Sequence, residues 1–183
     1  MSKYYDIDDL LTDAHRIPTV FQLSVPGMGY LESGRNESTD IVEGARIELP
    51  LWMADLLAIG GISDDLPTGF VTVSTPAPLS SRVVSALKAD AGSVDLRAQS
   101  LQFHRLALRW LSMAGDEKLL EAMMETLKAR AALINDFAHN TRGGSMMFDN
   151  TEFVSKLDEF EMKLFKTSHD SSRDFKKWLS TKK

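Results

Sequence analysis

A repeat of apolar side chains at helical spacing restricts the second half of this chain to a helical fold. Its members lie alternately four and three positions apart: Leu120, Met124, Leu127, Ala131, Ile134 and Ala138. Because an α-helix has 3.6 residues per turn, this spacing places all of them along one face for about five turns. A face of that length can pack along another helix. We therefore predict a helical seam that is either an interface with a partner or the core beneath one.

Further helices are predicted on both sides of the seam. Ser80 or Ser81 can cap a helix that continues to about Ala91. Residues 96–114 carry apolar side chains on more than one face, which is typical of a helix buried between neighbours. A last stripe at helical spacing comprises Phe153, Leu157, Phe160 and Leu164. We interpret this stripe, like the seam, as an interface or the core beneath it.

The first sixty residues show a different pattern. A short helix with an acidic side and an apolar side is expected within residues 4–14. A half-buried strand is expected at 17–25, with Pro18 at its edge or start, because the side chains alternate between apolar and polar from Val20 onward. A second strand is expected at 45–49. A strongly apolar helix should follow, in which Leu51 and Trp52 are expected to fasten the small domain.

These patterns divide the chain into two domains. Residues 1–61 are expected to form a small β-containing α/β domain. Residues 62–79 are rich in proline, glycine and aspartate and are predicted to be a linker. Residues 80–183 are expected to form a helical bundle. The predicted fold class is therefore mainly α, with a C-terminal helical bundle domain preceded by the small α/β domain.

Composition excludes several classes of protein. The chain has no cysteine, which excludes disulfides and thiolate metal sites and fits a reducing compartment. A formal net charge of -5 disfavours a duplex-binding module, since such modules carry a basic surface. No apolar run approaches the ~18 residues of a membrane span. We expect no membrane partner.

The usual signatures of catalysis are missing from the sequence. It contains no H-E-x-x-H, no G-K-[ST] and no G-x-S-x-G segment. We therefore predict no catalytic, cofactor-binding or metal-binding residue, and we expect the protein not to be an enzyme. His104 falls on a buried-looking helix, where a histidine is more often a hydrogen-bonded core residue than a ligand.

Two charged segments remain open to interpretation. The acidic run from Asp6 to Asp13 is either a solvated helix face or a docking site for a basic protein surface; it lacks the glycine and glutamate of a calcium loop. The basic end of the chain, from Arg173 onward, could touch nucleic-acid phosphates. We favour the simpler interpretation, because cations are stabilised near a helix C-terminus in any case.

The second half of the chain is also rich in methionine and aromatic residues. They are Met123, Met124, Met146, Met147, Phe148, Phe153, Phe160, Phe165, Phe175 and Trp178. A small core explains most of them. The apolar faces of four or five helices in about a hundred residues nevertheless exceed what one small bundle can hide, and methionine and aromatic residues are enriched at protein interfaces. We therefore predict that part of this surface contacts other subunits.

Four segments of the sequence resemble one protein family. ARIELPLWMA at 45–54 resembles the L-E-L-P-L-W-L-A segment of the third Psf subunit of the GINS complex, and SVDL at 93–96 resembles the entry to a long helix in that family. LDEFEMKLFKT at 157–167 is similar to its L-D-E-x-E-x-x-L-F-x-T signature, and SSRDFKKW at 171–178 falls where the family has an aromatic-bearing helix. The segments follow the order of the family and span most of the chain.

The resemblance implies a structural subunit of a nuclear DNA-replication complex. Its partners would be the three paralogous GINS subunits, together forming a heterotetramer, and then the MCM motor and a RecJ-like recruitment factor, with which the tetramer makes the replicative helicase. ATP hydrolysis would belong to MCM. Contact of this subunit with DNA is possible, and we expect it to be indirect. Two competing interpretations remain. One is a helical adaptor of an unrelated nuclear or cytosolic complex, and the other is a small enzyme with an unrecognised site.

Overall fold

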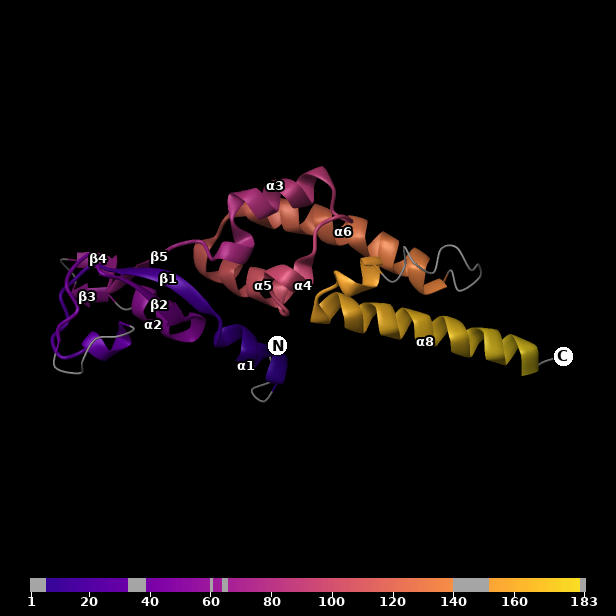
Figure 1. Ribbon diagram of the computed structural model, residues 1–183, viewed down its shortest axis with the longest axis horizontal. Helices are drawn as coiled ribbons and strands as arrows, with labels where there is room; N and C mark the ends of the chain where they lie inside the picture. Colours follow the sequence, from indigo (N-terminus) through magenta and orange to yellow (C-terminus); the bar gives the residue numbers. More distant parts are fainter. Residues whose placement is uncertain (1–5, 33–38, 60, 64–65, 140–151, 182–183) are drawn as a thin grey trace. The chain divides into compact units, whose positions relative to one another are not determined.

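The computed structural model describes residues 6–32, 39–59, 61–63, 66–139 and 152–181 (Figure 1). The chain divides into two compact units, Met1–Ala77 and Pro78–Lys183. Met146, Met147 and Phe148 of the predicted interface set lie outside the described residues.

The first unit is built on a three-stranded antiparallel sheet. Its strands are β1 (Arg16–Phe21), β2 (Arg46–Pro50) and β5 (Val71–Val73), in the order β2-β1-β5. In β1, alternate residues are buried, among them Ile17, which lies opposite Leu49 of β2. This alternation is what the two-residue period of a strand produces on a sheet with one covered face. The strand predicted at 17–25 begins one residue earlier and ends four residues earlier, at Phe21, and the strand predicted at 45–49 is shifted by one residue.

Two helices, a short 3-10 turn and a small hairpin also belong to this unit. They are α1 (Ile7–Asp13), α2 (Leu51–Ile59), the short 3-10 turn η1 (Gly29–Leu31), and the strands β3 (Gly61–Ser63) and β4 (Leu66–Gly69). Leu51 is fully buried, as its predicted packing role requires, but Trp52 is 45% exposed. One residue along a helix turns the side chain by about 100°, so Trp52 is only partly covered, and its role in fastening the small domain stays a prediction.

The predicted linker at 62–79 also differs from the structure. It contains β4 and β5, and Val71 of β5 is buried where this strand pairs with β1. The boundary between the units falls instead after Ala77. The proline and glycine residues of 62–79 led to the prediction of a linker. Strands of only three or four residues can lie between such residues, and they are too short to show an alternating pattern in the sequence.

One glycine in this unit allows a close backbone approach. A Cβ atom built on Gly69 would collide with the backbone carbonyl of Ala58 in α2. We expect Gly69→Ala to lower the free energy of unfolding by about 1–3 kcal/mol, because the backbone must shift to relieve the overlap. Urea denaturation measures this change. The exposed substitution Val42→Ala serves as the control, and equal stability of the two variants would contradict the packing described here.

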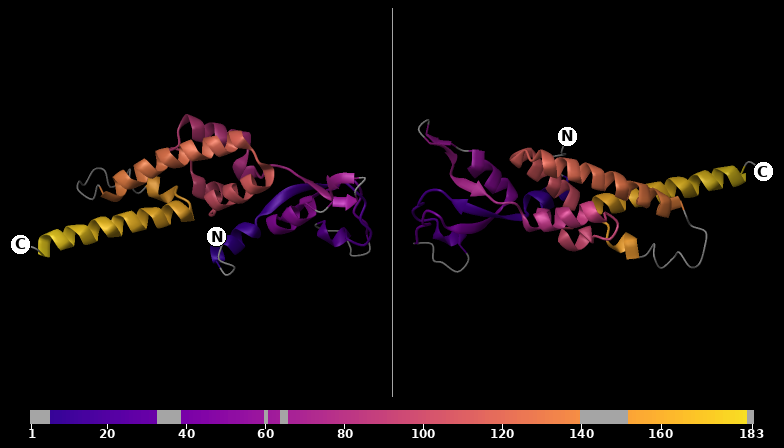
Figure 2. Two further views of the ribbon diagram at one scale, coloured as in Figure 1. Left: turned by 180° about the vertical axis from the view of Figure 1, so that it is seen from behind. Right: turned by 90° about the horizontal axis from the view of Figure 1, so that it is seen from above.

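The second unit is a helical bundle. The 3-10 turn η2 (Ala77–Leu79) lies at the boundary between the units. The helices of the second unit include α3 (Ser81–Ala89), α4 (Leu96–Gln99), α5 (Phe103–Ala114), α6 (Glu117–His139) and α8 (Glu159–Thr181). The long helices α6 and α8 lie side by side along part of their length (Figures 1 and 2). Part of the core is a cluster of Ile134, Phe153 and Leu157, where the rings of Phe137 and Phe153 are 5.0 Å apart. None of the described helices is long and apolar enough to span a membrane.

The helix predicted at 96–114 is interrupted. Asp95 caps α4 by accepting a hydrogen bond from the N–H of Ala98, and α4 ends after one turn. The carbonyl of Leu101, in the break, accepts a hydrogen bond from the N–H of Glu159 at the start of α8. In a continuous helix, the carbonyl of Leu101 would accept a hydrogen bond from within the helix. Here it accepts one from α8 instead, so a tertiary contact stabilises the break.

Candidate functional site

The predicted seam in α6 does not lie in one environment. Ile134 and Ala138 are buried and Leu127 and Ala131 are half-buried, as the prediction requires. Leu120 and Met124, however, are 46% and 48% exposed. The buried face of α6 consists of Leu119, Ala122, Met123, Thr126, Arg130, Ile134 and Ala138.

The second predicted stripe is divided in the same way. Phe153 and Leu157 are buried, whereas Phe160 is 42% and Leu164 39% exposed. Residues 156–158 are not helical and α8 begins at Glu159, so the stripe does not lie along one continuous helix. Its first half belongs to the core and its second half to the surface.

Four exposed apolar residues, Leu108, Leu120, Met124 and Phe160, line a groove between α5, α6 and α8. The residues that line it are His104, Arg105, Ala107, Leu108, Leu111, Leu120, Met123, Met124, Leu127 and Phe160. Leu108 is 66% exposed and faces the groove together with Leu120 and Met124. An apolar surface of this kind, drawn from three helices, marks an interaction site more often than a free surface. We take this surface, the α5–α6–α8 groove, as the candidate functional site.

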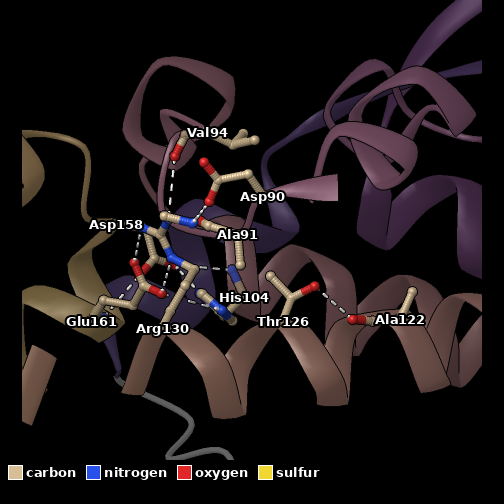
Figure 3. Close-up of polar contacts among 10 residues, drawn as sticks. Asp90, Ala91, Val94, His104, Ala122, Thr126, Arg130, Asp158 and Glu161 are labelled. Carbon is tan, nitrogen blue, oxygen red and sulfur yellow. Dashed lines mark hydrogen bonds and ion pairs between the residues drawn. The ribbon is translucent and has the colours of Figure 1, made fainter. Parts of the chain in front are cut away.

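Beside the groove, an ion pair is buried between α6 and α8 (Figure 3). The Nε and Nη2 groups of Arg130 donate to the two carboxylate oxygens of Glu161, at 2.7 and 2.8 Å, and both side chains are 0% exposed. The Nη1 group donates to the carbonyl oxygens of Ala91 and Val94, at 2.6 and 3.2 Å. Arg130 therefore joins α6 to α8 and to the loop after α3.

A second buried contact joins α5 to the start of α8. One carboxylate oxygen of Asp158 lies 2.8 Å from Nδ1 of His104 and accepts from its backbone N–H at 3.0 Å. The other oxygen accepts from the N–H of Glu161 at 2.8 Å, which is how a capping residue satisfies the first turn of a helix. Nε2 of His104 lies 3.8 Å from Glu161 Oε1. The side chains of Arg130, Glu161, Asp158 and His104 thus form one buried network. His104 also lines the α5–α6–α8 groove.

The same residues could be considered as a metal site. Ligand atoms of His104, Asp158 and Glu161 lie within 4.8 Å of one another. Both oxygens of Glu161 already face the guanidinium of Arg130, and both oxygens of Asp158 accept hydrogen bonds. A permanent cation beside these carboxylates opposes a second one by charge repulsion. The arrangement therefore favours an ion-pair network, whose effect is to fix the relative positions of the helices that line the groove.

Acid should weaken this network. Burial raises the pKa of the Asp158 carboxyl, but the hydrogen bond and charge of His104, with two backbone N–H groups, lower the pKa by more, so the net shift is downward. At acidic pH the folded state therefore binds fewer protons than the unfolded state. The stabilisation that ionised Asp158 provides is complete above about pH 4, where aspartates of the unfolded chain titrate, and it is lost as the pH falls from there toward the lower pKa of the folded state.

We expect Asp158→Asn to lower the free energy of unfolding at neutral pH by about 2–3 kcal/mol, because two backbone donors and His104 lose a charged acceptor. The variant should also lose less stability than the wild type between neutral and acidic pH. Urea denaturation at several pH values measures both effects. Asp136→Asn, at an exposed position on α6, should cost less than about 0.5 kcal/mol at neutral pH. A full-sized pH dependence in Asp158→Asn would contradict the assignment.

Sequence reasoning found only part of this network. It predicted His104 as a hydrogen-bonded core residue, which is confirmed. It missed Arg130, although Thr126, Arg130 and Ile134 recur every fourth residue on the buried face of α6. It also gave no structural role to Asp158 and Glu161, which both lie in the 157–167 segment.

Comparison with protein families matches both units. A family model described as "PSF3 N-terminal domain" matches residues 5–59, and one described as "GINS complex protein helical bundle domain" matches residues 78–180. The second match begins at Pro78, the first residue of the second unit.

Relatives match along the full length of the chain, and those described here are each named "DNA replication complex GINS protein PSF3". The protein of Phaeosphaeria nodorum is 44% identical over 181 residues, covering 98% of this chain and 97% of the relative. That of Debaryomyces hansenii is 40% identical over 178 residues, covering 97% and 98%. That of Saccharomyces cerevisiae is 34% identical over 194 aligned positions, covering 98% and 99%.

Proposed function

Because the chain belongs to the PSF3 family of DNA replication complex GINS proteins, we propose that it is a non-catalytic structural subunit of a GINS complex acting in DNA replication. Its direct partners are the three paralogous GINS subunits, with which it forms a heterotetramer. The tetramer joins the MCM motor and a RecJ-like recruitment factor in the nucleus. Because the chain belongs to this family, we do not favour the alternative that it is a helical adaptor of an unrelated complex.

The observation that carries the proposal is the α5–α6–α8 groove. Leu108, Leu120 and Met124 are between 46% and 66% exposed in the isolated chain, and burying them against a partner removes apolar surface from water. The site needs no titratable or nucleophilic group to do this. A subunit with such a surface acts by contact energy alone, which favours the assembled state over the separated chains.

The buried network supports this role. Arg130, Glu161, Asp158 and His104 connect α5, α6 and α8, and these three helices line the groove. A surface held in place before binding loses less conformational entropy when the partner docks. The network therefore contributes to assembly by keeping the groove in its binding conformation.

Co-expression tests the proposal. The chain and the three other GINS subunits of the same organism should co-purify as one species whose mass, measured by light scattering, equals that of one copy of each. In the control, one paralogue at a time is omitted from the co-expression. Loss of co-purification then shows which paralogue binds this chain directly. A chain that elutes as a monomer in the presence of all three paralogues would contradict the proposal.

A further inference from the structure

The local sequence of residues 96–114 favours one continuous helix, although the structure divides it into α4 and α5. The stretch contains no glycine, no proline and no β-branched residue, and leucine, alanine, arginine and glutamine make up most of it. These residue types are among the strongest helix formers. The caps also fit a single helix, because Asp95 caps the first turn and Gly115, with a φ of 63°, follows the last.

The break between the two helices, residues 100–102, lacks comparable local support. Ser100 has an extended backbone, with a φ of -163° and a ψ of 138°, and Gln102 precedes α5 without a side-chain cap. The hydroxyl of Ser100 accepts a hydrogen bond from the N–H of Gln102 at 3.3 Å, which is long for such a bond. The local preference of this stretch therefore conflicts with its tertiary structure.

The 156–159 segment supplies contacts that hold the break. The N–H of Glu159 donates to the carbonyl of Leu101 at 3.0 Å. A carboxylate oxygen of Asp158 accepts from the N–H of His104 at 3.0 Å (Figure 3). In a continuous helix, the same carbonyl and the same N–H would each pair with a residue four positions away. Both contacts therefore compete directly with the helical hydrogen bonds across the break.

A continuous helix would present the same apolar side chains on one side. Leu96, Phe103, Ala107 and Trp110 are all buried, and they are spaced seven, four and three positions apart. At 3.6 residues per turn, this spacing places all four on one side of a single helix. The same side chains can therefore face the core in both arrangements, and the difference lies in the hydrogen bonds at the break.

We propose that residues 96–114 form a two-state element, which is broken while the 156–159 segment is docked and continuous when that segment is released. The segment leads directly into Phe160, which lines the α5–α6–α8 groove. Release therefore removes Phe160 from the groove as it joins α4 to α5, and a partner that binds the groove favours the broken state. The inference goes beyond the proposed function and does not rest on it, because it concerns the isolated chain.

Glu159→Pro tests the proposal in the full chain. Proline is accepted at the first position of a helix, here that of α8, but it removes the N–H and directs its ring at the carbonyl of Leu101. The carbon chemical shifts of residues 100–102 distinguish extended from helical backbone, and saturation-transfer spectra give the population of a helical state. That population should be about tenfold larger than in Glu159→Ala, because one hydrogen bond is lost. The alanine control keeps the N–H and loses the 3.7 Å ion pair with Arg97.

A second pair of variants tests the same state without changing α8. Ser100→Ala and Ser100→Gly both remove the hydroxyl that accepts from Gln102, but alanine favours a helix and glycine disfavours it. The helical population should be about fivefold larger in the alanine variant. Equal populations in Glu159→Pro and Glu159→Ala overturn the proposal. If Glu159→Pro does not fold, equal populations in the two Ser100 variants, or no helical state in either, overturn it.

Discussion

Arg130→Met is expected to lower the free energy of unfolding by about 3–5 kcal/mol, because it leaves the carboxylate of Glu161 buried without its cation. Arg130 and Glu161 are both 0% exposed, and the two N–H···O contacts between them are 2.7 and 2.8 Å long. The carbonyls of Ala91 and Val94 lose their donor in the same substitution. Urea denaturation followed by circular dichroism measures the change.

Two further variants separate charge from packing in this prediction. Lys128→Met removes an exposed cation from the same helix and should change stability by less than about 0.5 kcal/mol. The double variant Arg130→Met/Glu161→Leu should recover part of the loss, because replacing both members of a buried ion pair is less costly than removing one. A double variant less stable than Arg130→Met would show that the stranded charge is not the cause.

The second large effect is expected in assembly rather than in folding. Leu120→Glu should weaken association with the paralogous subunits by at least about 2 kcal/mol, a factor of about 30 in Kd, because it buries a carboxylate at the centre of an apolar contact. Leu120 is 46% exposed in the isolated chain, so the thermal unfolding of the chain alone should hardly change. Association measured by light scattering or by titration of the other three subunits reports the effect.

A matched substitution on another helix provides the control for this effect. Ala86 is exposed on α3 and does not line the groove, so Ala86→Glu should assemble like the wild type. If Leu120→Glu assembles as well as Ala86→Glu, the groove is not where the paralogues bind.

The order of the two domains could be predicted from the sequence because the apolar residues of each domain recur with a different period. The alternation along β2 and the helical spacing along α6 are local patterns, and they survive in the structure. The position of β5 could not be predicted in the same way. A strand of three residues, Val71–Val73, is defined by its pairing with β1, fifty residues earlier in the chain, and such pairing leaves little trace in the local sequence.

The groove was not predicted from the sequence, although Leu120, Met124, Leu127 and Phe160 of its lining belong to the predicted seam and stripe. Two overlapping stripes on α6 satisfy the same spacing, and they differ by one position at their start, at Leu119 and Leu120. The structure buries Leu119 and exposes Leu120, because the neighbouring helices decide which stripe is covered. A spacing rule identifies a face of a helix, whereas only the packing shows what that face contacts.

The buried network could not be predicted because its members come from distant parts of the chain. His104 and Asp158 are separated by 54 positions and Arg130 and Glu161 by 31. A charged residue within a helix is usually exposed, so nothing in the local sequence marks Arg130 as the centre of a buried contact. Only the folded bundle brings its guanidinium to both oxygens of Glu161.

The lack of cysteine in this chain permits a direct test of whether partners cover the α5–α6–α8 groove. A single Met124→Cys substitution, at a side chain that is 48% exposed, supplies a thiol whose rate of modification reports access of solvent. We predict rapid labelling in the isolated chain and labelling slower by about tenfold or more in the four-subunit complex, with Ala86→Cys on α3 labelled equally in both. Equal labelling of Met124→Cys in the chain and in the complex would contradict the account.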